Sequence, residues 1–581
     1  MLFGKYVNQF YKKYFWFFVA GLLALLAVNY FQLFIPEIFG KIVDGISDGT
    51  IINNPELITE MLLKIGGIAI IMFTGRFAWR YAIFGIGVRV EADMRHMMFV
   101  HSEKLSETYY KKNKTGALMA LYTNDLFTIK EIFGRGTVML IDFIFLGSMV
   151  IIKMFMLNWM LTLIVLGPAL LLGFVFMKFG KRMQKKFKIL QKSHATISDF
   201  TQENISGISV IKAFVRENGK AKEFEEINQD NYGKSIDYLK TYMGFNSFLM
   251  IILNLVISGF CALGSYLILG DKMGFTTGEL LTFISYFNTL TWPMMAIGLV
   301  INLRSQAKAS LNRVTELLDE DPEIKDNHNT NYEIAGEICF NHLNFCYSDD
   351  PKPVLNDINF TIKKGEIVGI LGHTGCGKTT LVDLLLRMYN LEKNSILLDG
   401  NDIMDISVKT VRDAIGYVPQ DNFLFSDTVR NNIAFSNMNI LDENIIEAAK
   451  LADVDENIKG FTEGYETMVG ERGVTLSGGQ KQRISIARAL LKNPPIMIFD
   501  DSVSAVDTKT EESILRNLRE TRKGKTTIMV SHRISTVKNL DKIILLDEGK
   551  IVGIGNHESL LATSKLYQKM VNLQALEKEV N

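Results

Sequence analysis

Long apolar stretches are concentrated in the first 315 residues of the chain. Six of them reach the roughly 20 residues that a helix needs to cross a bilayer core. They cover residues 15–35, 63–88, 138–157, 159–178, 247–269 and 276–302. The first stretch runs too long and has no small-residue cleavage site, so it does not fit a cleaved signal peptide. The pattern predicts an α-helical membrane domain of six spans over residues 1–315.

Two long polar connections separate these spans, over residues 89–133 and 179–243. They are too polar to lie in lipid, yet they contain uninterrupted helix formers, as in residues 182–205. Such segments predict helices that continue tens of ångströms beyond the membrane, at about 1.5 Å per residue. Flexible loops are the alternative interpretation, and the uninterrupted helix formers argue against it.

The placement of lysine and arginine predicts the orientation, because cytoplasmic connections carry an excess of both. Residues 1–14 and both long connections are rich in basic residues, whereas the connection 36–62 is acidic. We therefore expect the N- and C-termini and the two long connections on the cytoplasmic side.

Three charged residues inside the spans, Arg76, Arg80 and Asp142, require an explanation, because a charge in lipid is costly. They either line a water-filled cavity that meets substrate or form an internal ion pair that fixes helix packing. Phe and Met side chains in such a cavity suit varied apolar ligands, although the same side chains commonly face lipid or pack helices. The candidates are Phe143, Phe145, Met294 and Met295.

The remaining sequence has the character of a soluble domain. Residues 316–332 are polar and predict a linker, and residues 333–581 predict an α/β domain. The whole chain holds 63 Lys+Arg against 63 Asp+Glu, which argues against a nucleic-acid partner bound through bulk charge. Its 48% hydrophobic content excludes a disordered chain. Its four cysteines lack the spacing of a disulfide framework or a zinc site.

A glycine-rich segment follows the apolar run 367–371 and precedes a stretch with helical spacing. Its pattern, G-x-x-x-x-G-K-[ST], predicts a phosphate-binding loop between a buried strand and a helix. The glycines let backbone N–H groups approach phosphate oxygens, and the helix N-terminus adds positive potential. We expect Lys378 to reach the outer phosphates and Thr379 to ligate Mg²⁺. The loop residues are Gly372, Thr374, Gly375, Cys376, Gly377, Lys378, Thr379 and Thr380.

Two further apolar runs end in polar residues. Residues 496–499 lead into Asp500 and Asp501, and residues 526–530 lead to His532. Ligands of open α/β sheets bind at the carboxyl ends of the strands. Asp500 is therefore expected to hold Mg²⁺ through water, with capping of the following helix as the alternative. His532 is a candidate contact to the γ-phosphate, or else a plain surface histidine.

Another helix is predicted to begin at residues 476–480, Leu-Ser-Gly-Gly-Gln. A helix N-terminus binds anions, so this is a second phosphate site in one domain. One nucleoside triphosphate already has its phosphates on the first loop. We therefore expect the second site to serve a nucleotide held by another subunit. Its residues are Leu476, Ser477, Gly478, Gly479 and Gln480.

With these motifs in this order, the chain resembles an ATP-binding cassette (ABC) exporter half-transporter over essentially all of its length. That family fuses a six-span membrane domain of the type IV, exporter-like fold to one α/β P-loop ATPase domain. The resemblance implies ATP and Mg²⁺ as cofactors and two ATP molecules bound between two cassettes. Segments 110–125 and 206–217 match the intracellular helices that transmit motion.

The resemblance also implies roles for single residues. Tyr347 matches the aromatic residue that stacks on adenine. Gln420 matches the glutamine that senses Mg²⁺ and the membrane domain. Asp507 lies in the segment 504–507, which matches the loop that crosses the dimer interface. His532 matches the switch histidine.

Asp501 departs from the family pattern, which has a glutamate here to polarise the attacking water. The intrinsic pKa values of Asp and Glu differ by only about 0.4 pH units, but Asp is one methylene shorter. A general base needs contact of about 2.6–3.2 Å with the water. A misplacement of about 1 Å can cost about 10²-fold in rate. We expect this site to bind ATP and to hydrolyse it poorly.

The intact segment 476–480 together with Asp501 resembles the degenerate subunit of bacterial heterodimeric multidrug exporters. That resemblance implies a second half-transporter as partner, a hydrophobic or amphipathic small molecule as substrate, and a place in the bacterial plasma membrane. A homodimeric lipid or peptide exporter that tolerates Asp501 is the alternative. An ATP-gated channel is a more remote alternative, because the sequence shows no added regulatory domain.

Overall fold

The computed structural model describes residues 3–270, 275–326, 332–347, 352–470, 473–502 and 508–580. The chain divides into two compact units. The first comprises Met1–Glu103 and Asn113–Glu320, and the second comprises Lys104–Lys112 and Asp321–Asn581. The short segment 104–112 therefore packs with the second unit, although it lies within the sequence of the first.

Helices build the first unit. Its N-terminal part consists of α1 (Asn8–Lys13), α2 (Phe15–Gln32), α3 (Phe34–Ser47), α4 (Thr50–Asn53) and α5 (Glu56–Ser102). A further long helix alternates α-helical and π-helical turns as α7 (Thr115–Ala120), η1 (Leu121–Asp125), α8 (Leu126–Glu131), η2 (Ile132–Gly136), α9 (Thr137–Ile141), η3 (Asp142–Leu146) and α10 (Gly147–Leu157). The unit ends with α11 (Trp159–Ser206), α12 (Ile208–Ala213), α13 (Glu217–Leu269) and α14 (Thr277–Asp319).

Among the described residues of this unit, five helical segments are long and apolar enough to cross a membrane: Phe15–Ser47, Glu56–Ser102, Thr115–Leu157, Glu217–Leu269 and Thr277–Asp319. They contain five of the six predicted spans. The remaining predicted span, residues 159–178, has a helical backbone within α11, but most of its side chains lie outside the described part of the structure.

Helix α14 continues to Asp319, so residues 316–319 are helix rather than the predicted linker. The reason is packing. Leu317 and Leu318 are buried and continue the apolar face that Leu311 and Val314 begin. At its other end α14 has a capping box, in which the Thr276 hydroxyl and the Glu279 carboxylate each accept a backbone N–H of the other residue.

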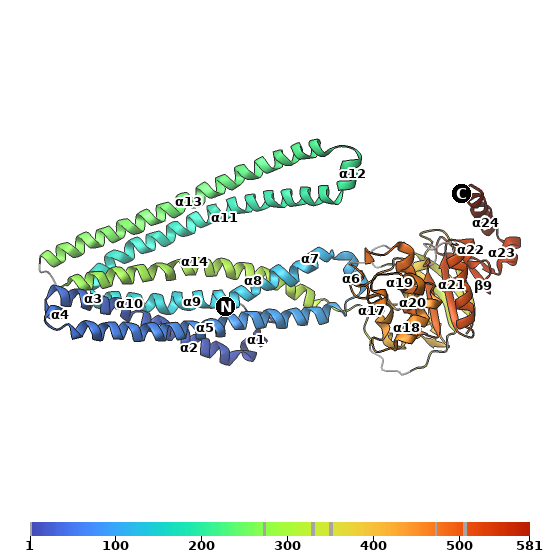
Figure 1. Ribbon diagram of the computed structural model, residues 1–581, viewed down its shortest axis with the longest axis horizontal. Helices are drawn as coiled ribbons and strands as arrows, with labels where there is room; N and C mark the ends of the chain where they lie inside the picture. The colour runs from blue at the N-terminus through green and yellow to red at the C-terminus, as the bar shows by residue number, and fades with distance from the viewer. Residues whose placement is uncertain are drawn as a thin grey trace. The chain divides into compact units, whose positions relative to one another are not determined.

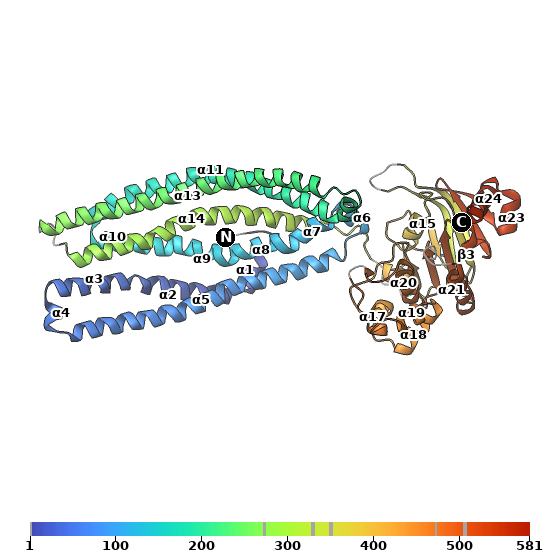
Figure 2. The ribbon, with the colours of Figure 1, turned by 45° about the horizontal axis from the view of Figure 1, so that its top comes forward.

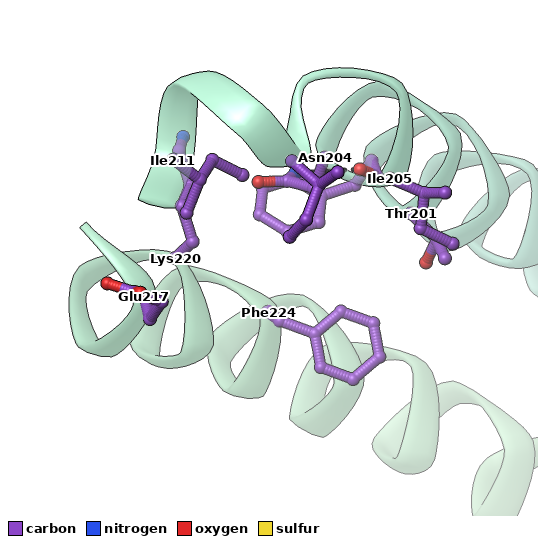
Figure 3. Close-up of a pocket in the computed structure, with 9 residues that line it drawn as sticks. Thr201, Asn204, Ile205, Ile211, Glu217, Lys220 and Phe224 are labelled. Carbon is purple, nitrogen blue, oxygen red and sulfur yellow. Dashed lines mark hydrogen bonds between the residues drawn. The ribbon is translucent and has the colours of Figure 1, made fainter. Parts of the chain in front are cut away.

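The polar connection 179–243 is helical, as predicted. Helices α11 and α13 run side by side and α12 joins them at the far end (Figures 1 and 2). A pocket of about 300 Å³ lies at this end, with Ile205 and Ile211 on one side and Phe224 on the other (Figure 3). The tip beyond it is apolar and exposed, since Phe214 is 74% and Val215 81% exposed.

Two sheets form the frame of the second unit. One is antiparallel, in the order β2-β1-β4-β5, with β1 (Ile338–Phe345), β2 (Leu355–Ile362), β4 (Ile396–Leu398) and β5 (Asn401–Asp402). The other has the order β10-β9-β3-β8-β7-β6, with β3 (Ile367–Leu371), β6 (Ile415–Val418), β7 (Ile496–Asp500), β8 (Thr526–Ser531), β9 (Lys542–Asp547) and β10 (Lys550–Gly555). Its strands pair in parallel except β10 with β9.

Strands β7 and β8 of the larger sheet are buried along their whole length, as expected for central strands of a mostly parallel sheet. The helices described in this unit are α6 (Glu107–Lys112), α15 (Lys378–Leu385), α16 (Val408–Ala414), α17 (Val429–Ile433), η4 (Ala434–Ser436), α18 (Asp442–Leu451), α19 (Asp455–Lys459), η5 (Gly464–Glu466), α20 (Gly478–Lys492), α21 (Thr508–Thr521), α22 (Ile534–Val537), α23 (His557–Thr563) and α24 (Lys565–Val580). Helices α15, α16, α20, α22 and α23 pack on strands of the larger sheet. Two hydrophobic cores result. One contains Val382 and Ile498, and the other contains Ile484 and Phe499.

Candidate functional site

The phosphate-loop segment joins β3 to α15, as the sequence predicts. Gly377 caps α15 at a φ of 101°, a left-handed conformation that favours glycine. A Cβ atom at Gly372 would lie 2.3 Å from the carbonyl oxygen of Leu546, so the chain requires glycine there too. The loop can therefore wind tightly enough to direct backbone N–H groups toward one anion.

The ammonium group of Lys378 lies over this loop. Its Nζ atom donates to the carbonyl oxygens of Gly372 at 2.7 Å and His373 at 2.8 Å. The charge is thus held at the centre of the loop, where it is suited to bind phosphate oxygens.

Thr380 and Thr379 lie in the first turn of α15 with different surroundings. Thr380 is buried and its hydroxyl shares a 2.8 Å hydrogen bond with the hydroxyl of Tyr347. The Tyr347 ring also meets Phe345 and Tyr389 edge-on, at centroid distances of 5.2 and 5.3 Å. Thr379 is exposed beside the loop. Of the two threonines, Thr379 is therefore the one accessible to a ligand.

Asp500 ends β7 with its side chain almost fully buried, at 2% exposure. Burial raises the pKa of this carboxyl, and the charge of Asp501 adds to the effect, whereas a hydrogen bond with Thr379 and the charge of Lys378 lower it. Its Oδ2 atom has no hydrogen-bond partner in the part of the chain that the structure describes. A buried carboxylate oxygen in this state fits a cation.

These residues fit Mg²⁺ on chemical grounds, because Thr379 and Asp500 offer the oxygen ligands that the ion prefers. Within the described ranges, no three His, Cys, Asp or Glu residues gather into a metal site. Phosphate oxygens would therefore have to supply much of the coordination. Gln420, the other predicted metal contact, follows strand β6 and is exposed.

Asp501 adopts a left-handed φ of 46° directly after the strand. Its backbone N–H donates to the Val530 carbonyl oxygen at 2.9 Å. Its Oδ2 atom and Nδ1 of His532 are joined by a hydrogen bond of 2.9 Å. The end of β7 and the end of β8 are therefore linked through these two side chains.

The phosphate loop, Asp500, Asp501 and His532 all follow neighbouring strands, because β8 lies between β3 and β7 in the parallel sheet. The structure thus brings these predicted residues to one sheet edge. Asp507 lies outside the described residues, together with the rest of the segment 503–507.

The segment 476–480 lies elsewhere, at the N-terminus of α20, which packs on α17, α18 and β6. Ser477 Oγ accepts the N–H of Gln480 at 3.3 Å, and Gln480 Oε1 accepts the N–H of Ser477 at 2.9 Å. Leu476 is buried, whereas Ser477 and Gly478 are exposed. The helix N-terminus is thus accessible from outside the unit.

A contact between α6 and the rest of the second unit has no counterpart among the predictions from the sequence. Lys111 Nζ donates to the Tyr389 hydroxyl at 2.9 Å. Burial raises the pKa of nearby Asp383 to about 6, and the charge of Glu107 adds to it. The only sequence signal is the Glu107–Lys111 spacing of one helical turn, which occurs on many exposed helices.

Arg76, Arg80 and Asp142 do not form the internal ion pair that was one of the two alternatives for them. Asp142 is buried and accepts hydrogen bonds from Asn29 Nδ2 at 2.9 Å and Trp292 Nε1 at 3.1 Å. Arg76 and Arg80 are exposed, and no ion pair joins them to Asp142 in the described structure. Neutral donors from two other helices satisfy this carboxylate, so no internal arginine is needed.

Comparison with protein families gives two matches. The family model described as "ABC transporter transmembrane region" matches residues 18–294. The one described as "ABC transporter" matches residues 355–504.

Curated and solved relatives extend the similarity to nearly the whole chain. The chain is 36% identical to the "Probable multidrug resistance ABC transporter ATP-binding/permease protein YheI" of Bacillus subtilis, over 98% of this chain and 97% of that protein. It is 35% identical to the "ATP-dependent lipid A-core flippase" of Syntrophus aciditrophicus, over 85% and 82% respectively. A solved bacterial Atm1-family ABC exporter with ATP bound superposes with a TM-score of 0.79, at 26% identity, over 96% of this chain and 99% of that chain.

Proposed function

We propose that this chain, which belongs to the ABC transporter family, is one half of a heterodimeric multidrug exporter and contributes its degenerate ATP site. Its transmembrane and ATP-binding domains are fused as in exporters. ATP binding by the second unit, and ATP hydrolysis coupled to transport, follow from the family. The heterodimer, the substrate class and the residue roles are the proposal.

In this proposal the loop amides and Lys378 bind the triphosphate, and Tyr347 stacks on the adenine. Thr379 and Asp500 hold Mg²⁺, with Gln420 on its outer side. When bound, the ion neutralises charge on the phosphate oxygens. The chain's own residues orient the γ-phosphate between the loop and His532.

The proposal of a degenerate site rests on one observation: the Asp501 side chain is short, and its carboxylate is hydrogen-bonded to His532 at 2.9 Å. A general base must reach an attacking water at about 2.6–3.2 Å. Asp501 lacks one methylene compared with the family's glutamate, so its carboxylate lies farther back when the backbone is the same. The expected cost is about 10²-fold in turnover at this site.

The exposed N-terminus of α20 supports a role for a partner. Ser477 and Gly478 are accessible, and the capping box leaves the helix dipole directed outward. In our proposal this segment completes the ATP site of a second half-transporter, and Asp507 belongs to the loop that crosses the dimer interface. That partner site carries most of the hydrolysis.

The proposed substrates are hydrophobic or amphipathic small molecules, in line with the multidrug relatives. Phe143 and Met295 are partly exposed in the single chain and are candidates for the cavity, with Phe145 and Met294. We place the chain in the bacterial plasma membrane with the N- and C-termini in the cytoplasm, because its basic connections favour that orientation. We propose that the boundary between the transmembrane and ATP-binding domains falls within residues 316–332, and the division of the chain into compact units after Glu320 supports it.

A homodimeric lipid exporter is the second candidate. The 35% identity to a lipid A-core flippase favours it, because that relative matches over most of its length. In a homodimer both sites would contain Asp501.

Purification of the full chain alone, in nanodiscs, tests the proposal. We expect weak ATPase activity, increased by Asp501→Glu, and a strong increase when the partner half is added. Asp501→Asn is the matched control and should not increase activity. Vigorous ATPase from a stable homodimer of the unmodified chain would refute the heterodimer.

A further inference from the structure

Helix α24 (Lys565–Val580) is anchored in the core of the second unit. Tyr567 and Met570 are 0% and 4% exposed and belong to the hydrophobic core that includes Phe499. The Tyr567 hydroxyl and Nδ1 of His557 are 2.7 Å apart, which fixes the start of the helix on α23. Gln574 follows Met570 by four residues and so lies on the same face of α24.

The side-chain amide of Gln574 makes two hydrogen bonds to one short segment of main chain. Its Nε2 atom donates to the carbonyl oxygen of His532, and its Oε1 atom accepts the N–H of Ile534, both at 2.7 Å. The amide therefore holds both ends of the turn 532–534 through which the chain leaves β8. A third hydrogen bond lies within the turn itself: the Arg533 N–H donates to Ser531 Oγ at 2.9 Å.

This turn lies beside the phosphate loop. Strands β3 and β8 are parallel neighbours in which Leu371 pairs with Ser531. His532 directly follows β8 and therefore comes level with Gly372, the first residue of the loop. Its imidazole is 45% exposed and reaches Asp501 at 2.9 Å, so its direction depends on how its main chain is held.

We propose that Gln574 is a positioning residue of the nucleotide site, which fixes the main chain of His532 so that the imidazole faces the γ-phosphate of ATP bound to the loop. The inference rests on the proposed γ-phosphate contact of His532. A side-chain amide has both an N–H donor and an oxygen acceptor, as these two bonds to backbone groups require. Alanine loses both bonds. Glutamate keeps the acceptor but places a charge against the His532 carbonyl oxygen until it is protonated.

The test compares ATP with ADP, because only ATP has a γ-phosphate. The full transporter is labelled with 8-azido-ATP at 4 °C in the presence of increasing ATP or ADP. The two chains are then separated by size, and the loss of label from this chain gives its affinity for each competing nucleotide. For Gln574→Ala we expect a roughly tenfold loss of ATP affinity and an unchanged ADP affinity. A tenfold loss corresponds to the loss of about one charge-assisted hydrogen bond to the γ-phosphate. For Gln574→Glu we also expect a selective loss of ATP affinity, because its charge faces the His532 carbonyl oxygen and its donor is gone.

Two further variants serve as controls for the role of Gln574. Gln568→Ala is the matched control on α24, since Gln568 Nε2 donates to the Leu561 carbonyl oxygen at 2.7 Å and does not reach the turn. It should leave both affinities unchanged. His532→Ala should lower ATP affinity selectively, and Gln574→Ala should add little to it.

Equal losses of ATP and ADP affinity in Gln574→Ala would overturn the inference in favour of a purely structural contact. Selective loss in His532→Ala without loss in Gln574→Ala would overturn it while leaving the proposed nucleotide site intact. No selective effect of His532→Ala would overturn both the γ-phosphate contact and the role of Gln574.

Discussion

Asp500 and Asp501 are adjacent carboxylates in different surroundings. Asp500 is buried at the end of an apolar strand, which raises its pKa. Asp501 turns away from the strand at a left-handed φ and reaches His532. The backbone turn thus separates two groups of the same charge, and only the buried one has the surroundings of a cation ligand.

The substitution Asp500→Asn should have opposite effects on the stability of the second unit without metal and on its stabilisation by MgATP. The folded state raises the pKa of Asp500, so the folded protein binds more protons and its free energy of unfolding falls as pH rises above the ordinary Asp value of 3.8. Without metal, in EDTA, Asp500→Asn should therefore stabilise the second unit, on the order of 1 kcal/mol, and more at pH 8 than at pH 5.

Thermal unfolding with and without MgATP measures both effects. The unmodified chain should be stabilised by MgATP, and Asp500→Asn should lose most of that stabilisation. A variant that is destabilised in EDTA at pH 8 would contradict the account of Asp500 as a strained buried charge.

Cys376 should react slowly with thiol reagents. Burial raises the pKa of this thiol, although the Lys378 ammonium opposes the effect. The reactive thiolate is therefore scarce at pH 7 and increases as pH rises toward 9. Mass spectrometry after N-ethylmaleimide treatment should find exposed Cys346 modified first and Cys376 later, faster at higher pH. ATP should protect Cys376 from modification, and an unchanged rate of Cys376 modification in the presence of ATP would contradict the loop assignment.

The N-terminus of helix α20 is both capped and exposed. Its capping box satisfies the first backbone N–H groups, which stabilises the helix. The same terminus is exposed and carries the positive end of the helix dipole. The element is therefore complete within this chain, and its exposed end is free to meet an anion from another molecule.

Two substitutions at Ser477 should separate capping from anion binding. Ser477→Ala removes the cap and should lower the free energy of unfolding by about 1 kcal/mol. Ser477→Asp keeps a capping oxygen but adds a negative charge where phosphate is expected. It should preserve stability and abolish ATPase in the assembled transporter. Chemical denaturation and phosphate release measure the two properties, and an active Ser477→Asp transporter would exclude phosphate binding here.

At the scale of the whole molecule, the hairpin of α11 and α13 ends in an apolar tip. Phe214 and Val215 are the most exposed large side chains there, and Val215 also adopts a left-handed φ of 52°, which is unfavourable for a β-branched residue. Exposed apolar surface combined with local strain is typical of a contact surface. A single chain leaves this surface uncovered, which fits a protein that works as a dimer.

Phe214→Ser should therefore uncouple the transporter without unfolding it. We expect a change in stability within about 0.5 kcal/mol, because the side chain is exposed. Substrate stimulation of ATPase should fall severalfold, while ATP binding to the second unit is retained. Tyr232→Ser, at an exposed position on α13 away from the tip, is the matched control. Full stimulation in Phe214→Ser would refute a coupling role for the tip.

The sequence by itself determined the division into a membrane part and an ATPase part, the glycine-rich loop between a strand and a helix, the two carboxylates at a strand end and the helix start at residues 476–480. These features depend on local patterns: apolar length, strand-to-helix order and glycine spacing. Only the tertiary structure showed that α14 continues into the expected linker, that Asn29 and Trp292 satisfy Asp142, and that Gln574 holds the turn after His532. Gln574 and His532 are 42 positions apart. Such pairs arise when separate elements pack together, and spacing along the chain does not encode that packing.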